Sequence, residues 1–407
     1  MVRLIRKKKC EVCKRQLTNE LNLGKHPMCD DLIPIKSEKK SKLYPIKISL
    51  CSKCLTVTQK VQIPKNTLFP KNYHYRAELT KDVVQGQKKL VMDLEKLFGN
   101  LKGKVVLDIG ANDFTLLDFF KKKNSITIGV EPTNAIKDAS KFHYKYQDYF
   151  NKKLALKIKK KFKKIDYITF TNVFAHIENL DQLLQNLKIL ISDKTSLIIE
   201  NHYLGSILKL SQFDTFYSEH PRTYSLKSFS FIAKKLGLKI SFCSFPKRYG
   251  GNIRVILSKK KSFLNKFKIE SMLKSESLFF KEYKNLKRKI KIWKMNKMKL
   301  FKSLNGKFGP LPAKAFPGRA AVLIKLLDLN ENNISAIYEK NNSMKIGNYA
   351  PGTRIKIISD SELRKLSKEI PIINLAWHIP KEIKSYLKSL GLKNKIIDIV
   401  QKKDFKI

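Results

Sequence analysis

The sequence predicts an α/β protein in which a doubly wound sheet lies between a small cysteine-bearing module and a smaller, Rossmann-like C-terminal α/β domain. Three observations predict this order. Two Cys-x-x-Cys pairs lie in a loop-rich segment at residues 1–66, strand and helix patterns alternate over residues 67–258, and a second alternation occupies residues 309–407. Strands separated by helices indicate parallel βαβ units. The 407 residues are also too many for one ordinary core.

The elements follow one another with clear boundaries. An amphipathic helix pattern at 82–98 ends at Gly99 and Gly103. The following segments predict strands at 104–109, 126–130, 165–170 and 196–200, with helices at 114–122, 134–142, 180–190 and 225–236. Residues 259–308 predict a basic helical connector, and three prolines at 309–317 mark the next boundary. The second αβ pattern comprises residues 321–327, 334–338, 370–376 and 381–390.

The charge is strongly positive, because 84 Lys and Arg face 34 Asp and Glu for a net charge of +50. Such a chain attracts nucleic acid, anionic membranes and phosphorylated small molecules alike. The lysines are scattered and interleaved with Ile and Asn, as in proteins from AT-rich genomes, so we do not expect a nucleic-acid partner. No apolar run approaches the roughly 18 residues of a membrane span. We therefore expect a cytoplasmic protein without a membrane partner; the sequence leaves open whether it is a monomer or a homodimer.

Four cysteines have the spacing of a metal site. Cys10 and Cys13 form one Cys-x-x-Cys pair, and Cys51 and Cys54 form the other. Two such pairs can complete a tetrahedral shell of four thiolates around Zn²⁺, which leaves no open position for a substrate. We expect a structural zinc ion here, whereas the isolated Cys29 and Cys243 are typical of small core residues.

The first strand of the central region ends in a candidate cofactor loop. Asp108-x-Gly110 lets the backbone approach a ligand closely, and Asn112 and Asp113 lead into the next helix. Glu131 ends the following strand, where a carboxylate can bind both hydroxyls of a ribose. This pattern is typical of S-adenosylmethionine binding, and the Gly-x-Gly-x-x-Gly of dinucleotide enzymes is absent from the sequence. A tight turn with a capping aspartate remains the structural alternative.

Further motifs make a resemblance to a known family specific. They are residues 170–177 (FTNVFAHI), 212–220 (QFDTFYSEH), 250–254 (GGNIR), 317–319 (PGR), 345–353 (KIGNYAPGT) and Trp377. Together with the cysteine pairs and residues 108–113, they resemble the nucleotide-sugar C-methyltransferases, which build C-3-branched deoxysugars. The resemblance implies a class I methyltransferase core, S-adenosylmethionine as methyl donor and a nucleotide-diphosphate 4-keto-deoxysugar as substrate.

The resemblance also implies residue roles. His220 would remove the proton next to the ketone, with Tyr217 and Glu219 beside it and Tyr75 reaching the same site. Imidazole titrates near neutral pH and a phenol can hydrogen-bond a developing enolate oxygen, so these residue types suit the chemistry. Asn172 would touch the cofactor, while His176 is equally compatible with lining the site and with a structural role.

The substrate would be bound partly by the C-terminal domain. Arg254, Arg319 and Lys345 are candidate diphosphate partners, and Tyr224 and Asn252 are further candidate substrate contacts. The sequence departs from the family at Phe114, Ser218, Tyr249, Asn252, Ala315 and Phe316, which predicts an active enzyme with altered sugar specificity. Two alternatives are a nucleic-acid methyltransferase with a zinc ribbon and a non-catalytic sugar-nucleotide-binding relative.

Overall fold

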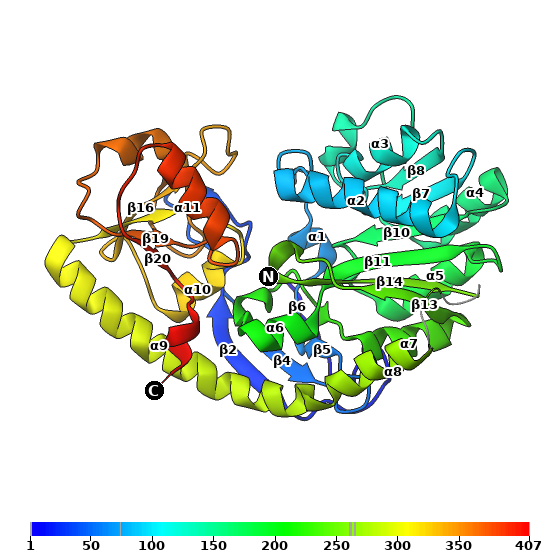
Figure 1. Cartoon of the computed structure of the whole chain (residues 1–407), viewed down its shortest axis with the longest axis horizontal. Helices are drawn as coiled ribbons and strands as arrows, with labels where there is room; N and C mark the ends of the chain where they lie inside the picture. The colour runs from blue at the N-terminus through cyan, green and yellow to red at the C-terminus, as the bar shows by residue number, and fades with distance from the viewer. Residues whose placement is uncertain (1, 74, 260–262, 264–265, 407) are drawn as a thin grey trace.

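The computed structural model describes residues 2–73, 75–259, 263 and 266–406. Its central layer is a seven-stranded sheet with the order β13-β14-β11-β10-β7-β8-β9 (Figure 1). The parallel strands are β7 (Val105–Ile109), β8 (Ile126–Val130), β9 (Tyr144–Tyr146), β10 (Tyr167–Thr171) and β11 (Ser196–His202). The edge is completed by β14 (Asn252–Ser258), which is antiparallel to both β11 and β13 (Lys239–Ser244).

Helices cover both faces of this sheet because successive strand residues point to opposite sides. Val106 packs on one face with α2 (Lys81–Phe98) and α3 (Thr115–Lys121). Leu107 packs on the other with α4 (Lys152–Phe162), α5 (Leu180–Leu190) and α7 (Leu226–Leu236). The short helix α6 (Leu204–Leu210) follows β11. The doubly wound class I methyltransferase fold predicted from the sequence is thereby confirmed.

The N-terminal module consists of short antiparallel pairings, the largest of which is a sheet that includes one strand from the methyltransferase core. Its strands are β1 (Ile5–Arg6), β2 (Glu20–His26), β3 (Ile33–Pro34), β4 (Tyr44–Leu50), β5 (Val57–Gln59) and β6 (Val61–Gln62), followed by helix α1 (Lys65–Leu68). β5 pairs with β12 (Arg222–Thr223), which comes from far along the chain. The module is therefore built against the core by main-chain hydrogen bonds as well as by side chains.

A long helix joins the core to the C-terminal domain. After α8 (Lys266–Ser275) and the 3₁₀ turn η4 (Glu276–Leu278), helix α9 (Phe279–Phe308) runs beneath both domains in Figure 1. Glu276 is fully buried and accepts hydrogen bonds from the first amides of α7 at 2.6 and 2.8 Å. Trp293 contacts Phe213 with ring centroids 4.9 Å apart and donates to the Ile399 carbonyl. The basic helix predicted at 259–308 is present, although residues 260–262 and 264–265 lie outside the described residues.

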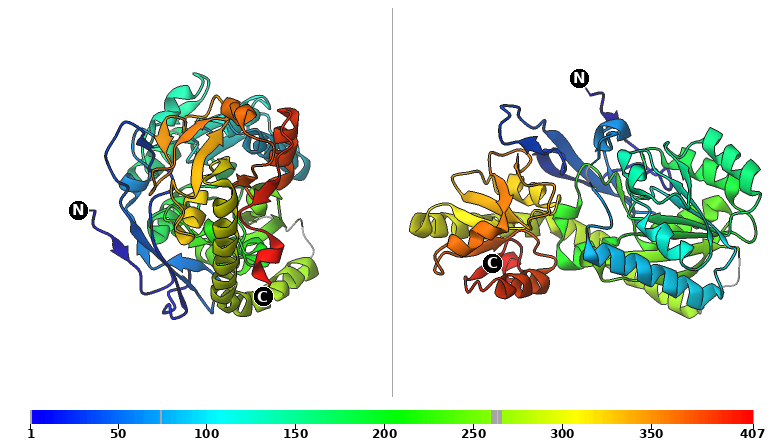
Figure 2. Two further views of the ribbon diagram at one scale, coloured as in Figure 1. Left: turned by 90° about the vertical axis from the view of Figure 1, so that its left-hand side faces the viewer. Right: turned by 90° about the horizontal axis from the view of Figure 1, so that it is seen from above.

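The C-terminal domain contains a five-stranded parallel sheet of order β18-β16-β15-β19-β20. The strands are β15 (Leu311–Lys314), β16 (Ile334–Glu339), β18 (Ile357–Ser359), β19 (Ile372–Asn374) and β20 (Ile396–Asp398), with helices α10 (Ala320–Leu326) and α11 (Pro380–Ser389). β17 (Asn348–Tyr349) pairs with β3, so the N-terminal strands contact this domain too, as the view from above shows (Figure 2).

Some expectations about single elements are wrong. The helix predicted at 134–142 is only a 3₁₀ turn, η1 (Asn134–Asp138), and Ala139 is extended. The chain leaves this turn at Ala139 and soon enters β9, which pairs with β8, so the segment does not continue as a helix. Strands β9, β13 and β14 and helices α4 and α6 were not predicted. Among the described residues, none of the helices has the length and apolarity of a membrane span.

Candidate active site

A cavity of about 620 Å³ lies where the carboxyl ends of the two parallel sheets face each other. Ligands of parallel α/β sheets bind outside these strand ends. From the methyltransferase core the lining residues follow β7, β8 and β10, and from the C-terminal domain they follow β15, β16 and β19; they include Gly110, Glu131, Asn172, Phe316, Glu339 and His378. The N-terminal module adds Cys29 and Asp30, so all three units contribute to one cavity.

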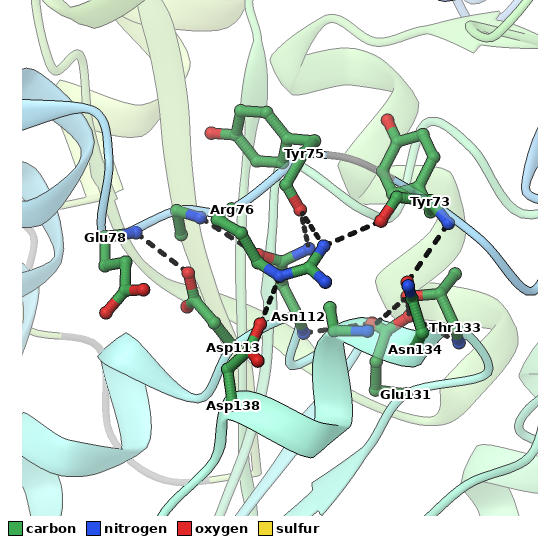
Figure 3. A network of polar contacts seen from close by, with 12 residues as sticks. Tyr73, Tyr75, Arg76, Glu78, Asn112, Asp113, Glu131, Thr133, Asn134 and Asp138 are labelled. Atoms are coloured by element: carbon green, nitrogen blue, oxygen red, sulfur yellow. Dashed lines mark hydrogen bonds and ion pairs between the residues drawn. The ribbon is translucent and has the colours of Figure 1, made fainter. Parts of the chain in front are cut away.

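The candidate cofactor loop turns tightly at Gly110. Gly110 has φ +77°, and a Cβ at this position would lie 2.6 Å from both methyl groups of Val173. Glu131 accepts hydrogen bonds from the amides of Asn112 and Thr133, each at 2.9 Å, and from the Thr133 hydroxyl (Figure 3). Burial raises the pKa of Asp108 to about 7 although the Thr169 hydroxyl donates to it. A close backbone turn between two strand-end carboxylates suits the ribose and amino-acid groups of S-adenosylmethionine.

Residues 75–78 cross over this loop and are fastened to it. The Ala77 amide donates to Asn112 Oδ1 and the Glu78 amide to Asp113 Oδ2, both at 2.9 Å (Figure 3). Arg76 is ion-paired with Asp138. Tyr75 therefore reaches the cavity lining, as does Tyr73, whose hydroxyl donates to Asp30.

All but one of the predicted cofactor residues line the cavity. Asp108, Gly110, Asn112, Glu131 and Asn172 line the cavity. Asp113 is not among its described lining residues and instead accepts from the amide and hydroxyl of Thr115 at the start of α3. Asp113 therefore shapes the loop, and we do not retain it as a cofactor ligand.

The departure from the family at Phe114 has a local explanation. Phe114 has φ +68°, the left-handed region that favours the glycine of the family's pattern. Its ring is fully buried, and a Cβ on Gly129 would lie 2.2 Å from it. The Phe114 ring thus fits at this turn because Gly129 in the neighbouring strand has no side chain.

Three aromatic side chains lie around the candidate base. The His220 ring lies 4.0 Å from Tyr217, 4.9 Å from His176 and 5.2 Å from His202, measured between ring centroids. His220 Nδ1 is 3.0 Å from the Thr215 carbonyl oxygen, which can only accept, so Nδ1 carries the proton. Nε2 therefore has the lone pair and accepts from the Tyr217 hydroxyl at 2.9 Å.

The protonation of His220 follows from its surroundings. Burial lowers the pKa of His220 well below its ordinary value, and the neighbouring His176 and His202 lower it further. The ring is therefore neutral at physiological pH, and Nε2 carries no proton. Neutral imidazole is the form that a general base requires.

Glu219 presents an unpartnered carboxyl oxygen in the same cavity. Its Oε1 accepts from the Cys29 amide at 2.7 Å, while Oε2 is buried and has no hydrogen-bond partner among the described residues. Burial, and to a lesser extent the charge of Asp30, raises the pKa of Glu219 to about 8. Glu219 is thus a neutral acid at physiological pH, with its proton on the oxygen that has no other partner.

Of the predicted diphosphate partners, Arg319 and Lys345 line the cavity. Arg319 binds Asp214 through two nitrogens, at 2.8 and 2.6 Å, and Trp377 donates to the same carboxylate. Its main contact therefore fastens the C-terminal domain to residues 212–220. The ammonium group of Lys345 donates to the Phe316 carbonyl at the cavity wall.

Tyr224, Asn252 and Arg254 are not among the described lining residues of the cavity. Tyr224 is fully buried beside Phe174 and Phe229 and accepts from Arg222. Asn252 and Arg254 both donate to the buried Glu200 beneath the site. These placements do not support the expected substrate contacts, because each side chain is used inside the core.

Sequence reasoning missed several lining residues, among them Asp30, His202, Glu339 and His378. His202 ends β11, and a polar residue at the end of a parallel strand is a signal that could have identified it. His378 is preceded by Trp377, which carries part of the resemblance, but nothing in the sequence places its ring beside the methyltransferase domain.

The four predicted metal ligands converge in the N-terminal module. The sulfur atoms of Cys10, Cys13, Cys51 and Cys54 all lie within 4.8 Å of one another. Each pair closes a turn in which the fifth residue's amide donates to the first cysteine's carbonyl, at 2.9 and 3.0 Å. Four converging, mostly buried thiols suit the tetrahedral coordination of a structural Zn²⁺ and leave no ligand position for a substrate.

Comparisons with known proteins agree with this arrangement. Models of three domain families match in order: a zinc binding domain over residues 10–69, a methyltransferase domain over 84–241 and a C-methyltransferase C-terminal domain over 247–397. The C-methyltransferase NovU of Streptomyces niveus is 24% identical over 250 residues, and the match spans 60% of this chain and 59% of that protein.

Two solved methyltransferase structures are similar to less than half of the chain. Magnesium protoporphyrin IX methyltransferase from Synechocystis is 13% identical with a TM-score of 0.34, covering 46% of this chain and 89% of that one. A SAM-dependent methyltransferase from Aquifex aeolicus is 15% identical with a TM-score of 0.32, covering 43% and 97%. By these three matches, the chain has the domain composition of an S-adenosylmethionine-dependent methyltransferase that combines a zinc-binding domain with a C-methyltransferase C-terminal domain.

Proposed function

We propose that the protein methylates carbon 3 of a nucleotide-linked 4-keto-deoxysugar, next to the ketone. The observation that carries this proposal is the position of His220, Tyr217 and Glu219 in the same cavity as Asp108 and Glu131. A base and an acid near a methyl donor are the groups that carbon methylation through an enolate requires. The name of NovU and the matched C-terminal domain support carbon as the acceptor atom.

The chain's own residues can perform the proton transfers. His220 accepts the proton from the carbon next to the ketone, and the Tyr217 hydroxyl, 2.9 Å from Nε2, can carry that proton to it. The protonated Glu219 donates a hydrogen bond from Oε2 to the ketone oxygen as negative charge develops there. S-adenosylmethionine, held by the loop between Asp108 and Glu131, would supply the methyl group to the carbon next to the ketone. The ketone is restored in the product.

The two facing sheets support a divided binding site. Asp108, Gly110 and Glu131 are on the methyltransferase side, where the cofactor would bind. Lys345, Phe316 and His378 are on the C-terminal side, where the sugar nucleotide would bind. An aromatic ring and a cation at the wall suit a nucleotide base and a diphosphate respectively. In the proposed binding mode the sugar ring lies next to His220.

Methyl transfer to a panel of nucleotide-linked sugars tests the proposal. Labelled S-adenosylmethionine is incubated with the enzyme and with nucleotide-linked 4-keto-deoxysugars, and the product is analysed by mass spectrometry and NMR. A methyl group on carbon 3 supports the proposal. Methylation of RNA or DNA in place of the sugars, or cofactor binding without any methylated product, would overturn it and favour one of the two alternatives.

A further inference from the structure

A buried ion pair connects the zinc module to the loop that carries the catalytic candidates. Glu11 lies between the metal ligands Cys10 and Cys13, and its Oε2 is 2.5 Å from Arg222 Nη1. Glu11 is 7% exposed and Arg222 only 1%. Both charges are therefore removed from water, and each depends on the other for compensation.

Glu11 has further partners on the module side. Lys7 Nζ lies 3.0 Å from its Oε1, and Gln62 Nε2 donates to its Oε2 at 3.1 Å. The carboxylate is thereby held by the first Cys-x-x-Cys turn and by strand β6. Its position follows that of the metal turn, since only backbone bonds separate it from Cys10.

Arg222 lies two residues after His220 on the other side of this contact. It is the first residue of β12, which pairs with β5 of the module. Its Nε donates to the Tyr224 hydroxyl at 3.0 Å, while Nη2 is buried without a hydrogen-bond partner among the described residues. The guanidinium therefore depends on Glu11 for its charge compensation.

The module also holds the loop from Tyr217 to Pro221 directly. The Gln59 side chain donates to the Tyr217 carbonyl at 2.5 Å, and the Gln59 amide donates to the Pro221 carbonyl at 2.9 Å. The Cys29 amide donates to Glu219 at 2.7 Å. The ion pair is therefore one of several contacts between the zinc module and residues 217–222.

We propose that Glu11 and Arg222 are positioning residues that transmit the geometry of the zinc turn to the loop carrying Tyr217, Glu219 and His220. This inference rests on the proposed function, because it concerns how the proposed base and acid are held. The His220–Tyr217 hydrogen bond depends on the register of this loop. A misplacement of about 1 Å at such a site costs as much as about a hundredfold in rate.

The test uses the full-length, zinc-containing protein with three single substitutions. Arg222→Met removes the guanidinium but keeps its stem, and Glu11→Gln keeps an acceptor oxygen but removes the charge. Lys7→Met is the matched control, because it removes the other ion pair of Glu11 without touching Arg222. Zinc content, S-adenosylmethionine affinity, kcat, KM and amide hydrogen exchange of peptides covering residues 217–223 are measured for each variant.

We expect Arg222→Met and Glu11→Gln to keep zinc and cofactor affinity, to speed exchange in 217–223 about tenfold and to lower kcat about 10- to 100-fold. The Lys7→Met control should change neither the exchange rate in 217–223 nor kcat. Unchanged exchange and kcat in both variants, even with a lower melting temperature, would overturn the proposal, because the pair would then be only structural. Loss of zinc from both would also overturn it, since the pair would then serve the metal site.

The hydrogen-exchange measurement separates this proposal from the proposed function. If the wild-type protein methylates none of the keto-sugars, the proposed function fails, whereas faster exchange at 217–223 would still support positioning by the ion pair. If the wild type is active and the exchange is unchanged, only the positioning proposal fails.

Discussion

The neutral state of Glu219 predicts an alkaline decline in the rate. Burial, with a smaller contribution from Asp30, raises the pKa of Glu219 from 4.5 to about 8. At 1.36 kcal/mol per pKa unit, holding this carboxylate ionised in the cavity costs about 5 kcal/mol. In the proposed reaction the acid on Oε2 donates to the ketone oxygen below pH 8, whereas the ionised form would repel the developing negative charge. The wild-type kcat should therefore fall as pH rises through about 8.

The size of the decline follows from a single ionisation. With a pKa of about 8, kcat at pH 9 should be about tenfold lower than at pH 7. The assay measures initial rates from pH 6 to 10 with both substrates saturating, which separates kcat from cofactor binding at Asp108. His220 should add no decline near pH 6.5, because burial lowers the pKa of His220 well below that range.

Two substitutions assign the decline to Glu219. Glu219→Gln keeps an N–H donor at every pH, so its profile should be flat from pH 7 to 9. Glu219→Ala has no donor and should be slower by about 100-fold at pH 7. An alkaline decline that persists unchanged in Glu219→Gln, or a wild-type kcat that increases through pH 8, would refute the assignment of Glu219 as the acid.

Stability gives an independent check with a defined sign. The pKa of Glu219 is higher in the folded chain than in the unfolded chain, so the folded state binds a proton that the unfolded state releases above about pH 4.5. The stability of the wild type relative to Glu219→Gln should accordingly be greatest below pH 4.5 and be lost as pH rises towards 8. Thermal melting of both proteins across this range measures the difference.

Three further substitutions test other parts of the site. His220→Ala should abolish turnover while S-adenosylmethionine affinity, measured by calorimetry, stays within about twofold; a collapse of affinity would contradict the role of His220 as base. Cys51→Ser should lose the metal and unfold the N-terminal module, since metal binding and folding are coupled; zinc analysis and near-UV circular dichroism check this, and retained zinc would count against the site. Gly110→Ala should weaken cofactor binding because its Cβ meets Val173 at 2.6 Å. Adding Val173→Ala should restore all but the roughly 1–2 kcal/mol of left-handed strain, and no recovery would place the defect elsewhere.

Local patterns predicted the fold well where burial acts on a single element. Strand Ile126–Val130 and helix Leu180–Leu190 have the boundaries that their apolar periodicity indicated. The expected helix at 134–142 is wrong because the chain becomes extended at Ala139 on its way to β9, whose pairing with β8 is a contact between separate elements. Strand β14 was missed because its pairing with β11 is long-range, and β13 was missed with it because β13 pairs with β14.

In the site, too, the residues placed by local patterns could be predicted, and those placed by long-range contacts could not. Asp108, Gly110 and Glu131 could be predicted because their positions follow from strand ends, which hydrophobic patterning reveals. Arg254 could not, because its partners Glu200 and Asp93 come from two other elements, and a lone arginine in the sequence looks equally suited to a phosphate. Charged residues near a site are thus ambiguous until the carboxylates around them are known.

The stretch from Gln212 to Arg222 explains why so short a motif is so specific. Asp214 holds Arg319 and Trp377 of the C-terminal domain, Tyr217 and His220 face the cavity, and Arg222 reaches the zinc turn. A substitution there must satisfy partners in three separate units, so few residue types are compatible at each position. Ser218 is a position where the family pattern is broken, and no side-chain hydrogen bond from its hydroxyl is found among the described residues. Specific motifs of this kind mark the place where domains meet around a ligand, which is also where reaction chemistry requires fixed geometry.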